Sequence, residues 1–140
     1  MKRQLPFLIA CFLIIPQLQA QTGQWMKKEI TLISSTGYEN PLYNVRELAA
    51  TFTSPSGRQK TVRGFWDGGN DWKIRFVPDE VGMWTYKTSC SDEKNAGLHE
   101  VEGTFECVKN QSPHVIYQKG SIKRNPGKYH LSYADGSPFF

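Results

Sequence analysis

The sequence predicts an all-β protein folded as an antiparallel β-sandwich. Six or seven short apolar or alternating runs follow one another at roughly 8–12-residue spacing, which is typical of sandwiches. Residues that favour turns separate these runs, and aromatic residues make up 13% of the chain. No segment shows the i, i+3, i+4 spacing of an amphipathic helix. We therefore expect strands throughout, packed around an aromatic core.

The expected strands follow in order along the chain. Alternation within the second one places Leu48, Ala50 and Phe52 on one face. Turn signals rich in Gly, Pro, Asn and Asp separate neighbouring strands, and Pro78 ends the fourth. The predicted strands are 25–32, 45–53, 58–66, 71–77, 83–90 and 103–108.

The hairpin formed by 58–66 and 71–77 has a register that can be predicted. If the turn is centred on Gly69, residues at equal distances before and after Gly69 lie opposite each other. Because side chains alternate along a strand, successive pairs lie on opposite faces of the hairpin. One face pairs Trp66 with Trp72, Gly64 with Ile74 and Val62 with Phe76; the other pairs Phe65 with Lys73, Arg63 with Arg75 and Thr61 with Val77.

This hairpin holds the candidate binding residues, and two interpretations of it stand side by side. The two Trp rings either complete the core or form a platform on which a sugar ring stacks. The facing arginines either splay apart to pair with acids such as Asp79 and Glu80, or form a basic face for a neighbouring domain or a uronate-rich polysaccharide. The candidate carbohydrate-binding residues are Trp66, Trp72, Arg63, Lys73 and Arg75.

Residues 80–86 have the spacing of the corner that enters strand F in immunoglobulin-like sandwiches, with Trp84 where a Tyr commonly sits. Cys90 then shares a face with Trp84, and Cys107 shares one with Phe105 on the next strand. A disulfide between Cys90 and Cys107 is allowed in an oxidising compartment, and two small buried thiols are the alternative.

The N-terminus predicts export. Lys2 and Arg3 precede an apolar run at 5–15, and small Ala20 provides a cleavage site, so residues 1–20 form a signal peptide. A lipoprotein-type box at 8–11, with acylation at Cys11, is the less favoured alternative. The apolar run is shorter than the roughly 20 residues of a membrane-spanning helix, and no later run is longer. We expect a periplasmic or extracellular protein.

Charge and motifs exclude several function classes. The formal charge is +4, and it falls to +2 once the first 20 residues are removed, which is too small to indicate nucleic acid or anionic membrane as a partner. The sequence holds no nucleophile elbow, no His/Cys cluster at metal-ligand spacing and no phosphate-binding loop. We predict no catalytic residue, no metal site and no cofactor, so the chain as it stands is not expected to be an enzyme.

The C-terminal part, 110–140, has a different character. A linker-like Gln-Ser-Pro at 111–113 leads to short extended pieces at 115–117 and 120–123, then to a turn at 125–127 and a further strand. A last turn at 135–138 leads into Phe139 and Phe140. Because two large apolar residues are unusual at a terminus, we expect a strand to begin at Phe139 and its continuation to be missing.

Several strings in this sequence resemble one known domain. They are GFWDGGN at 64–70, WKIRFVP at 72–78, GMWTY at 82–86, GTFECV at 103–108 and ADGSPFF at 134–140. The chain is similar, over about 24–140, to a bacterial domain of unknown function that precedes the catalytic barrel of apiosidase-like glycoside hydrolases.

The resemblance implies an immunoglobulin-like sandwich at 21–109, then a linker and β-hairpin at 110–140 that lead into a truncated (β/α) barrel. It implies a non-catalytic accessory domain of an exported glycoside hydrolase acting on plant-type polysaccharide, which packs on or orients the barrel of the same polypeptide. A carbohydrate-binding module is the alternative. Catalytic carboxylates of such barrels lie at strand C-terminal ends, and none carries over to this sequence.

Overall fold

The computed structural model describes residues 21–127 and 129–139. The predicted signal peptide, including Cys11, lies outside the described residues, and so does Phe140. Within the described part of the chain, no helix is long and apolar enough to span a membrane.

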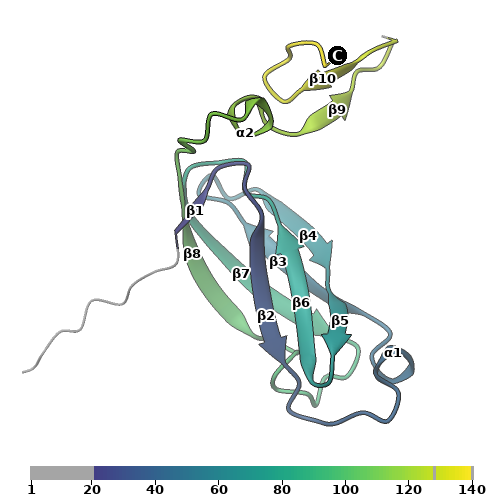
Figure 1. Cartoon of the computed structure of the whole chain (residues 1–140). Coiled ribbons are helices and arrows are strands. Elements are labelled where there is room, and N and C mark those ends of the chain that lie inside the picture. The colour runs from purple at the N-terminus through teal and green to yellow at the C-terminus, as the bar shows by residue number, and fades with distance from the viewer. Residues whose placement is uncertain (1–20, 128, 140) are drawn as a thin grey trace, which may run out of the picture.

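Two sheets face each other and confirm the all-β sandwich (Figure 1). The five-stranded sheet has the order β1 (Gln21–Gly23), β8 (Glu102–Val108), β7 (Gly82–Cys90), β3 (Leu48–Thr53) and β4 (Gln59–Arg63). The three-stranded sheet has the order β2 (Lys28–Ile33), β6 (Asp71–Phe76) and β5 (Phe65–Gly68).

One strand pair departs from the expected antiparallel arrangement, because β1 runs parallel to β8. A turn follows β1, in which the Met26 N–H donates to the Gly23 carbonyl, and the chain then enters β2 in the other sheet. Since no hairpin joins β1 to β8, their relative direction is not restricted to antiparallel.

Aromatic side chains from both sheets fill the space between them. Phe52 of β3 and Phe76 of β6 stack with ring centroids 4.0 Å apart, so this pair joins the two sheets directly. Trp84 lies 5.0 Å from Phe76, and Phe105 lies 6.3 Å from Trp84. Each large side chain buried in this way contributes on the order of 1.5–3 kcal/mol. The expected inward face of β3, with Leu48, Ala50 and Phe52, is confirmed.

Gly64 is the point at which the chain passes from one sheet to the other. Its N–H donates to the Leu48 carbonyl at 2.8 Å. A Cβ at Gly64 would lie 2.8 Å from Leu48 Cδ2 and 2.9 Å from Ile74 Cγ1, so only glycine fits without displacing the core. The prediction of one strand over 58–66 is therefore wrong.

This crossing splits the predicted hairpin register in two. Beyond Gly64, the pairs Trp66–Trp72 and Phe65–Lys73 are confirmed. Before it, β4 pairs with β3, and Arg63 lies opposite Ala49 rather than Arg75.

Two short helices were not predicted, α1 (Pro41–Asn44) and α2 (Val115–Lys119). Each is about one turn long, too short to display helical periodicity, and 115–117 had been expected to be extended. After α2, the strands β9 (Ile122–Arg124) and β10 (Leu131–Tyr133) form the expected hairpin. The Phe139 N–H donates to the Leu131 carbonyl at 2.9 Å, so the chain continues along β10.

We call residues 115–139 the tail. It stands beyond one end of the sandwich (Figure 1). Its described contact with the sandwich includes Gly120, where a Cβ would lie 2.7 Å from the Trp25 ring and 2.8 Å from Ala134 Cβ.

Candidate functional site

The five predicted carbohydrate-binding residues lie in more than one environment. Trp72 is 3% exposed and belongs to the core, while Trp66 is partly buried and packs against it. The Trp66 indole N–H donates to the Gly69 carbonyl at 2.9 Å. Lys73 and Arg75 lie on the opposite side of β6 from Trp72, and Arg63 belongs to the other sheet. A flat platform made of both Trp rings is therefore excluded.

Acidic residues already pair with the basic residues on the outer face of the three-stranded sheet. Arg75 Nε lies 2.8 Å from Glu29 Oε2, and Lys73 pairs with both Glu29 and Asp67. The hydrogen bond from Arg75 lowers the pKa of the Glu29 carboxyl, and the one to Asp67 raises the pKa of Lys73. The Arg75 guanidinium also lies 4.7 Å from the Phe65 ring centroid.

The prediction that Arg63 and Arg75 lie together on one basic face is therefore wrong. Arg63 pairs with Glu47 at 3.4 Å on the five-stranded sheet, and Arg75 pairs with Glu29 on the other sheet. Asp79 and Glu80 pair with basic residues other than Arg63 and Arg75. Arg58 pairs with both acids, and Lys60 pairs with Asp79.

The strand crossing at Gly64 opens a pocket of about 350 Å³ beside α1, which we call the crossover pocket. This volume lies within the roughly 300–1,000 Å³ of small-molecule sites. The pocket brings together three of the five predicted residues, Arg63, Trp66 and Trp72, and leaves out Lys73 and Arg75. Trp72 Nε1 is buried, and the described part of the chain gives it no hydrogen-bond partner.

A larger, open groove of about 780 Å³ covers the outer face of the five-stranded sheet. Its lining includes Thr51, Thr53, Thr85, Lys87 and Glu102. Lys87 pairs with Glu100 at 3.0 Å and with Glu102 at 3.3 Å, so these three side chains together carry a formal charge of −1. The sequence analysis did not identify this groove, although threonines at alternate positions in 51–53 mark the face.

Of the two alternatives for Cys90 and Cys107, the structure has two buried thiols rather than a disulfide. Both thiols are free and buried. Cys107 lies opposite Gly82 at one end of the nine-residue strand β7, and Cys90 is at its other end. At about 3.3 Å per residue the two are on the order of 26 Å apart, whereas a disulfide needs Cα atoms within about 7 Å. Burial raises the pKa of the Cys107 thiol to about 11.

The predicted corner before β7 is closed by a side-chain hydrogen bond. The Trp84 indole N–H donates to the Glu80 carbonyl, four residues upstream, at 2.8 Å. This is the bond that the corner Tyr makes in immunoglobulin-like sandwiches, with an indole in place of a phenol.

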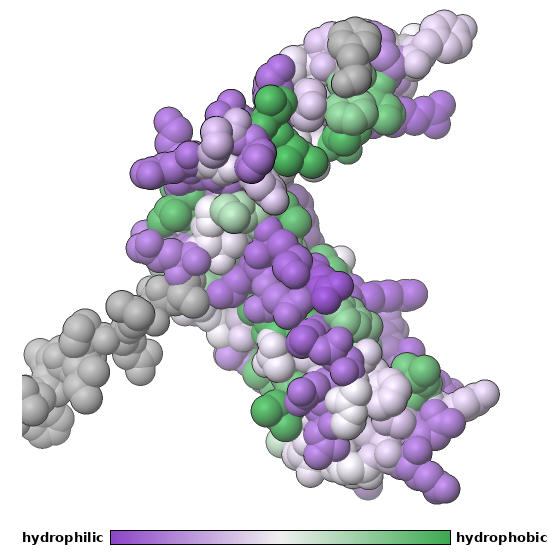
Figure 2. Space-filling view, in the orientation of Figure 1, coloured by the Kyte–Doolittle hydropathy of each residue, from purple (hydrophilic) through white to green (hydrophobic). Residues whose placement is uncertain are grey.

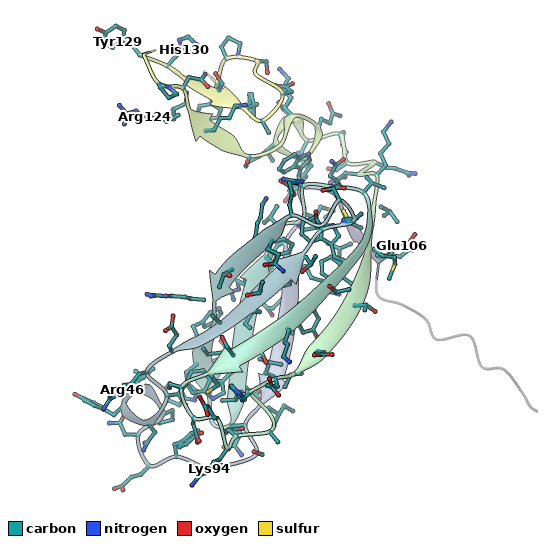
Figure 3. The ribbon with its side chains drawn as sticks, turned by 180° about the vertical axis from the view of Figure 1, so that it is seen from behind. Arg46, Lys94, Glu106, Arg124, Tyr129 and His130 are labelled. Carbon is teal, nitrogen blue, oxygen red and sulfur yellow. The ribbon has the colours of Figure 1, made fainter. Side chains whose placement is uncertain are left out.

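Exposed apolar side chains gather on the tail. Among the described residues, thirteen large hydrophobic residues are exposed, and six of them lie in the tail. The tail patch consists of Val115, Ile116, Ile122, Tyr129, Leu131 and Phe139. Figure 2 shows hydrophobic residues on this part of the molecule. Tyr129 lies at the far tip of the tail, beside His130 (Figure 3). So concentrated an apolar surface is typical of an interaction site.

The described residues hold no group of three His, Cys, Asp or Glu side chains placed to bind a metal ion. Fold and surfaces thus define a small β-sandwich domain with a pocket at one end and an apolar tail at the other. By sequence, the chain belongs to the family described as domain of unknown function DUF5060, whose profile matches residues 21–91.

A solved structure is similar to the whole domain. The crystal structure of a candidate glycoside hydrolase from Bacteroides vulgatus ATCC 8482 matches with a TM-score of 0.68 and 29% sequence identity. The match covers 87% of this chain but only 22% of that one, so this chain spans less than a quarter of the similar protein. No curated protein matches the sequence.

Proposed function

We propose that this chain is a non-catalytic accessory domain of an exported glycoside hydrolase, and that it packs on and orients a catalytic (β/α) barrel. The observation that carries the proposal is the unequal coverage of the match. Nearly all of this chain, 87%, corresponds to 22% of a candidate glycoside hydrolase. The remaining length of a protein of that kind has room for a separate catalytic domain.

The tail patch supports a specific surface for this packing. The exposed fractions of Val115, Ile116 and Leu131 are 48%, 48% and 43%, although each side chain is large and apolar. Burying them against a barrel would contribute roughly 0.8 kcal/mol for each CH₂ removed from water. The occupant we propose is the barrel of the same polypeptide, to which the tail would connect.

The finer features of the proposal come from the sequence strings. The inference of export rests on the signal-peptide pattern of residues 1–20. The inference of an apiosidase-like barrel that acts on plant-type polysaccharide rests on the resemblance of the strings between residues 64 and 140. The gene sequence beyond codon 140 tests the proposed barrel directly. A barrel in the same reading frame is expected, and a stop codon there would make the chain a free-standing module.

The packing surface can be tested on residues 21–140, which lack the apolar run at 5–15 that would itself bind an apolar dye. A dye that fluoresces on apolar surface is expected to bind the chain, and the double variant Ile116→Ser/Leu131→Ser is expected to reduce its fluorescence. Val81→Ser is the matched control, because Val81 is 50% exposed on the sandwich rather than on the tail. A monomeric chain that unfolds cooperatively and binds no dye would contradict packing through the tail patch.

A further inference from the structure

We infer that the surface on which the tail packs is acidic, with carboxylates placed to meet two cations beside the tail patch, Lys119 and Arg124. The inference rests on the proposed packing against a barrel of the same polypeptide, and it adds the chemistry of the barrel's contact face. Three observations carry it: the distribution of charge along the chain, the position of these two cations, and the scarcity of acidic groups around them.

The formal charge of the mature chain is unevenly divided. Residues 21–114 hold 11 basic and 12 acidic residues, a formal charge of −1, whereas the tail holds four basic residues and one acid, a formal charge of +3. The acid, Asp135, accepts hydrogen bonds from the Ser137 N–H and hydroxyl, both at 2.8 Å, and so closes a local turn. Charge concentrated on one segment acts on association and on the choice of partner rather than on the fold.

Lys119 and Arg124 lie beside the exposed apolar side chains of the hairpin. Arg124 is opposite Leu131, and Ile122 is opposite Tyr133, so these four side chains share one face of the β9–β10 pair. The Lys119 ammonium lies 5.3 Å from the Tyr133 ring centroid, which places it next to that face. The tail therefore has the composition of an interface, with apolar side chains in the middle and charged ones at the rim.

The cations of the tail differ from those of the sandwich in their partners. Seven of the 11 basic residues in 21–114 form an ion pair with an acid. Among the described residues of the tail, Lys119, Lys123 and Arg124 have no such partner. Carboxylates on the barrel face would supply the missing partners of Lys119 and Arg124.

The size of this effect suits a tethered partner. One exposed charge pair changes an equilibrium by a factor of roughly 1.5 to 5, so two pairs change it about 2- to 30-fold. That is a weak preference between free proteins. Within one polypeptide the effective concentration of the partner reaches the millimolar range, and a preference of this size then decides whether the tail is packed or free.

The same charges disfavour two other occupants of the tail patch. In a two-fold dimer the same patch faces itself, so the cations of one copy would meet those of the other, and like charges across an interface suppress that pairing. Anionic lipid is typically recognised by clusters of about four to eight basic residues. Only Lys119 and Arg124 are placed beside the apolar face of the described hairpin.

Hydrogen exchange in the complete polypeptide that the gene encodes after residue 20 tests the inference. In 0.1 M NaCl, where charges act over about 10 Å, Lys119→Gln/Arg124→Gln is expected to raise the exchange rates of β9 and β10 amides about 2- to 30-fold. In 1 M NaCl the screening length falls to about 3 Å, and the wild type is expected to approach the variant. The same variant of residues 21–140 alone measures any effect within the tail, and it should be small.

The matched control is Arg46→Gln/Lys94→Gln. It removes the same charge from two exposed residues at the opposite end of the sandwich from Arg124 (Figure 3), and tail exchange should not change. Equal exchange in wild type and Lys119→Gln/Arg124→Gln in the complete polypeptide would overturn the inference and leave the packing intact. If wild-type tail amides exchange as fast there as in residues 21–140, the proposed packing itself is wrong, and the inference with it.

Two measurements on residues 21–140 examine the other occupants. Sedimentation in 0.1 M NaCl is expected to show a monomer, and the chain is expected not to bind vesicles of phosphatidylglycerol. Self-association of the wild type would assign the tail patch to a second copy. Vesicle binding that is lost in Lys119→Gln/Arg124→Gln would assign it to a lipid surface. Either result would overturn an acidic barrel face as the partner.

Discussion

Asn95 joins two loops at one end of the sandwich, and its side chain is fully buried. Its amide nitrogen donates to Ser34 Oγ and to the Tyr38 hydroxyl, both at 2.7 Å. Its amide oxygen accepts from the Ser35 N–H at 3.0 Å and from the Gly97 N–H at 3.2 Å. One side chain therefore satisfies polar groups from two segments about sixty positions apart in sequence.

Replacing Asn95 with Ala should destabilise the fold strongly. The change removes the hydrogen bonds that the amide makes, each of which contributes about 0.5–1.5 kcal/mol, and it leaves a cavity in place of a fully buried side chain. We expect the free energy of unfolding to fall by roughly 2–4 kcal/mol in urea titrations. Lys94→Ala, in the same loop but exposed, is the control and should change stability by less than about 0.5 kcal/mol. Equal effects of the two substitutions would contradict a structural role for the Asn95 amide.

At the residue scale, the features that the sequence predicted correctly were those set by residues close together in the chain. Alternation alone placed Phe52, Trp84 and Phe105 inside, and all three are buried. Known local spacing also predicted the corner at 80–86, where the Trp84 indole N–H donates to the Glu80 carbonyl. Asn95 was missed because its partners lie far away in sequence, and a polar residue in a polar loop carries no signal that it is buried.

At the scale of elements, the strand crossing at Gly64 decides the arrangement of both sheets. Apolar residues alternate without interruption from Val62 to Trp66, so the pattern predicts one strand. The switch depends on the small size of Gly64, which lets the backbone pass between Leu48 and Ile74. That requirement is a property of packing in three dimensions, and the position of the crossover pocket follows from it.

Gly64→Ala should therefore overpack the core. The added methyl group would lie within 3.0 Å of Leu48 and Ile74 side-chain atoms, and overpacking typically costs about 1–3 kcal/mol. Thermal and urea unfolding measure the loss. Gly37→Ala is the control, because a Cβ there meets nothing within 4 Å, and it should be neutral or slightly stabilising. If Gly64→Ala were as stable as the wild type, the close approach at the crossing would be refuted.

The ion pairs on the outer face of β6 predict a pH dependence. The pKa of Glu29 is lowered, chiefly by the hydrogen bond from Arg75, so the folded state favours the ionised carboxyl. The resulting stability is fully present above the ordinary Glu pKa of about 4.3 and is lost as the pH falls through the lower, folded-state pKa. We expect Glu29→Gln to lower the urea midpoint at pH 7 and to converge on the wild type near pH 3.

The matched control for this prediction is Glu93→Gln, an exposed residue in the loop after β7. Its midpoint should follow that of the wild type at each pH. A Glu29→Gln midpoint that stays below the wild type by the same amount from pH 7 to pH 3 would show that lost packing, rather than charge, causes the effect.

At the scale of the whole molecule, the sandwich and the tail differ in how they are held. Every residue of the buried hydrophobic cluster lies between Ile30 and Cys107. The tail contributes buried positions such as Gly120 and Ser132 but no large apolar side chain to that cluster. The sequence predicted this change of character after residue 109 and the hairpin that follows. It did not predict α2, because a helix of about one turn is too short to show the periodic spacing of apolar residues by which a helix is recognised.

This difference predicts two levels of stability within one chain. Local opening needs less free energy where few apolar contacts are lost, so amides in β9 and β10 should exchange with deuterium well before those in β3 and β7. Gly120→Ala should accelerate exchange in the tail further. Its φ of 79° and ψ of −168° lie in a region almost confined to glycine, and a Cβ would meet the Trp25 ring.

The amides of β3 serve as the internal reference for this measurement, because the Gly120 substitution lies outside the core and should leave their exchange unchanged. Faster exchange in β9 and β10 alone would show that the tail is attached through the Trp25 contact and opens by itself. Simultaneous acceleration of β3 and β9 would instead mean that tail and sandwich unfold as one unit. In that case the tail patch would be part of the cooperative domain, and its packing on a barrel should raise the stability of the sandwich as well.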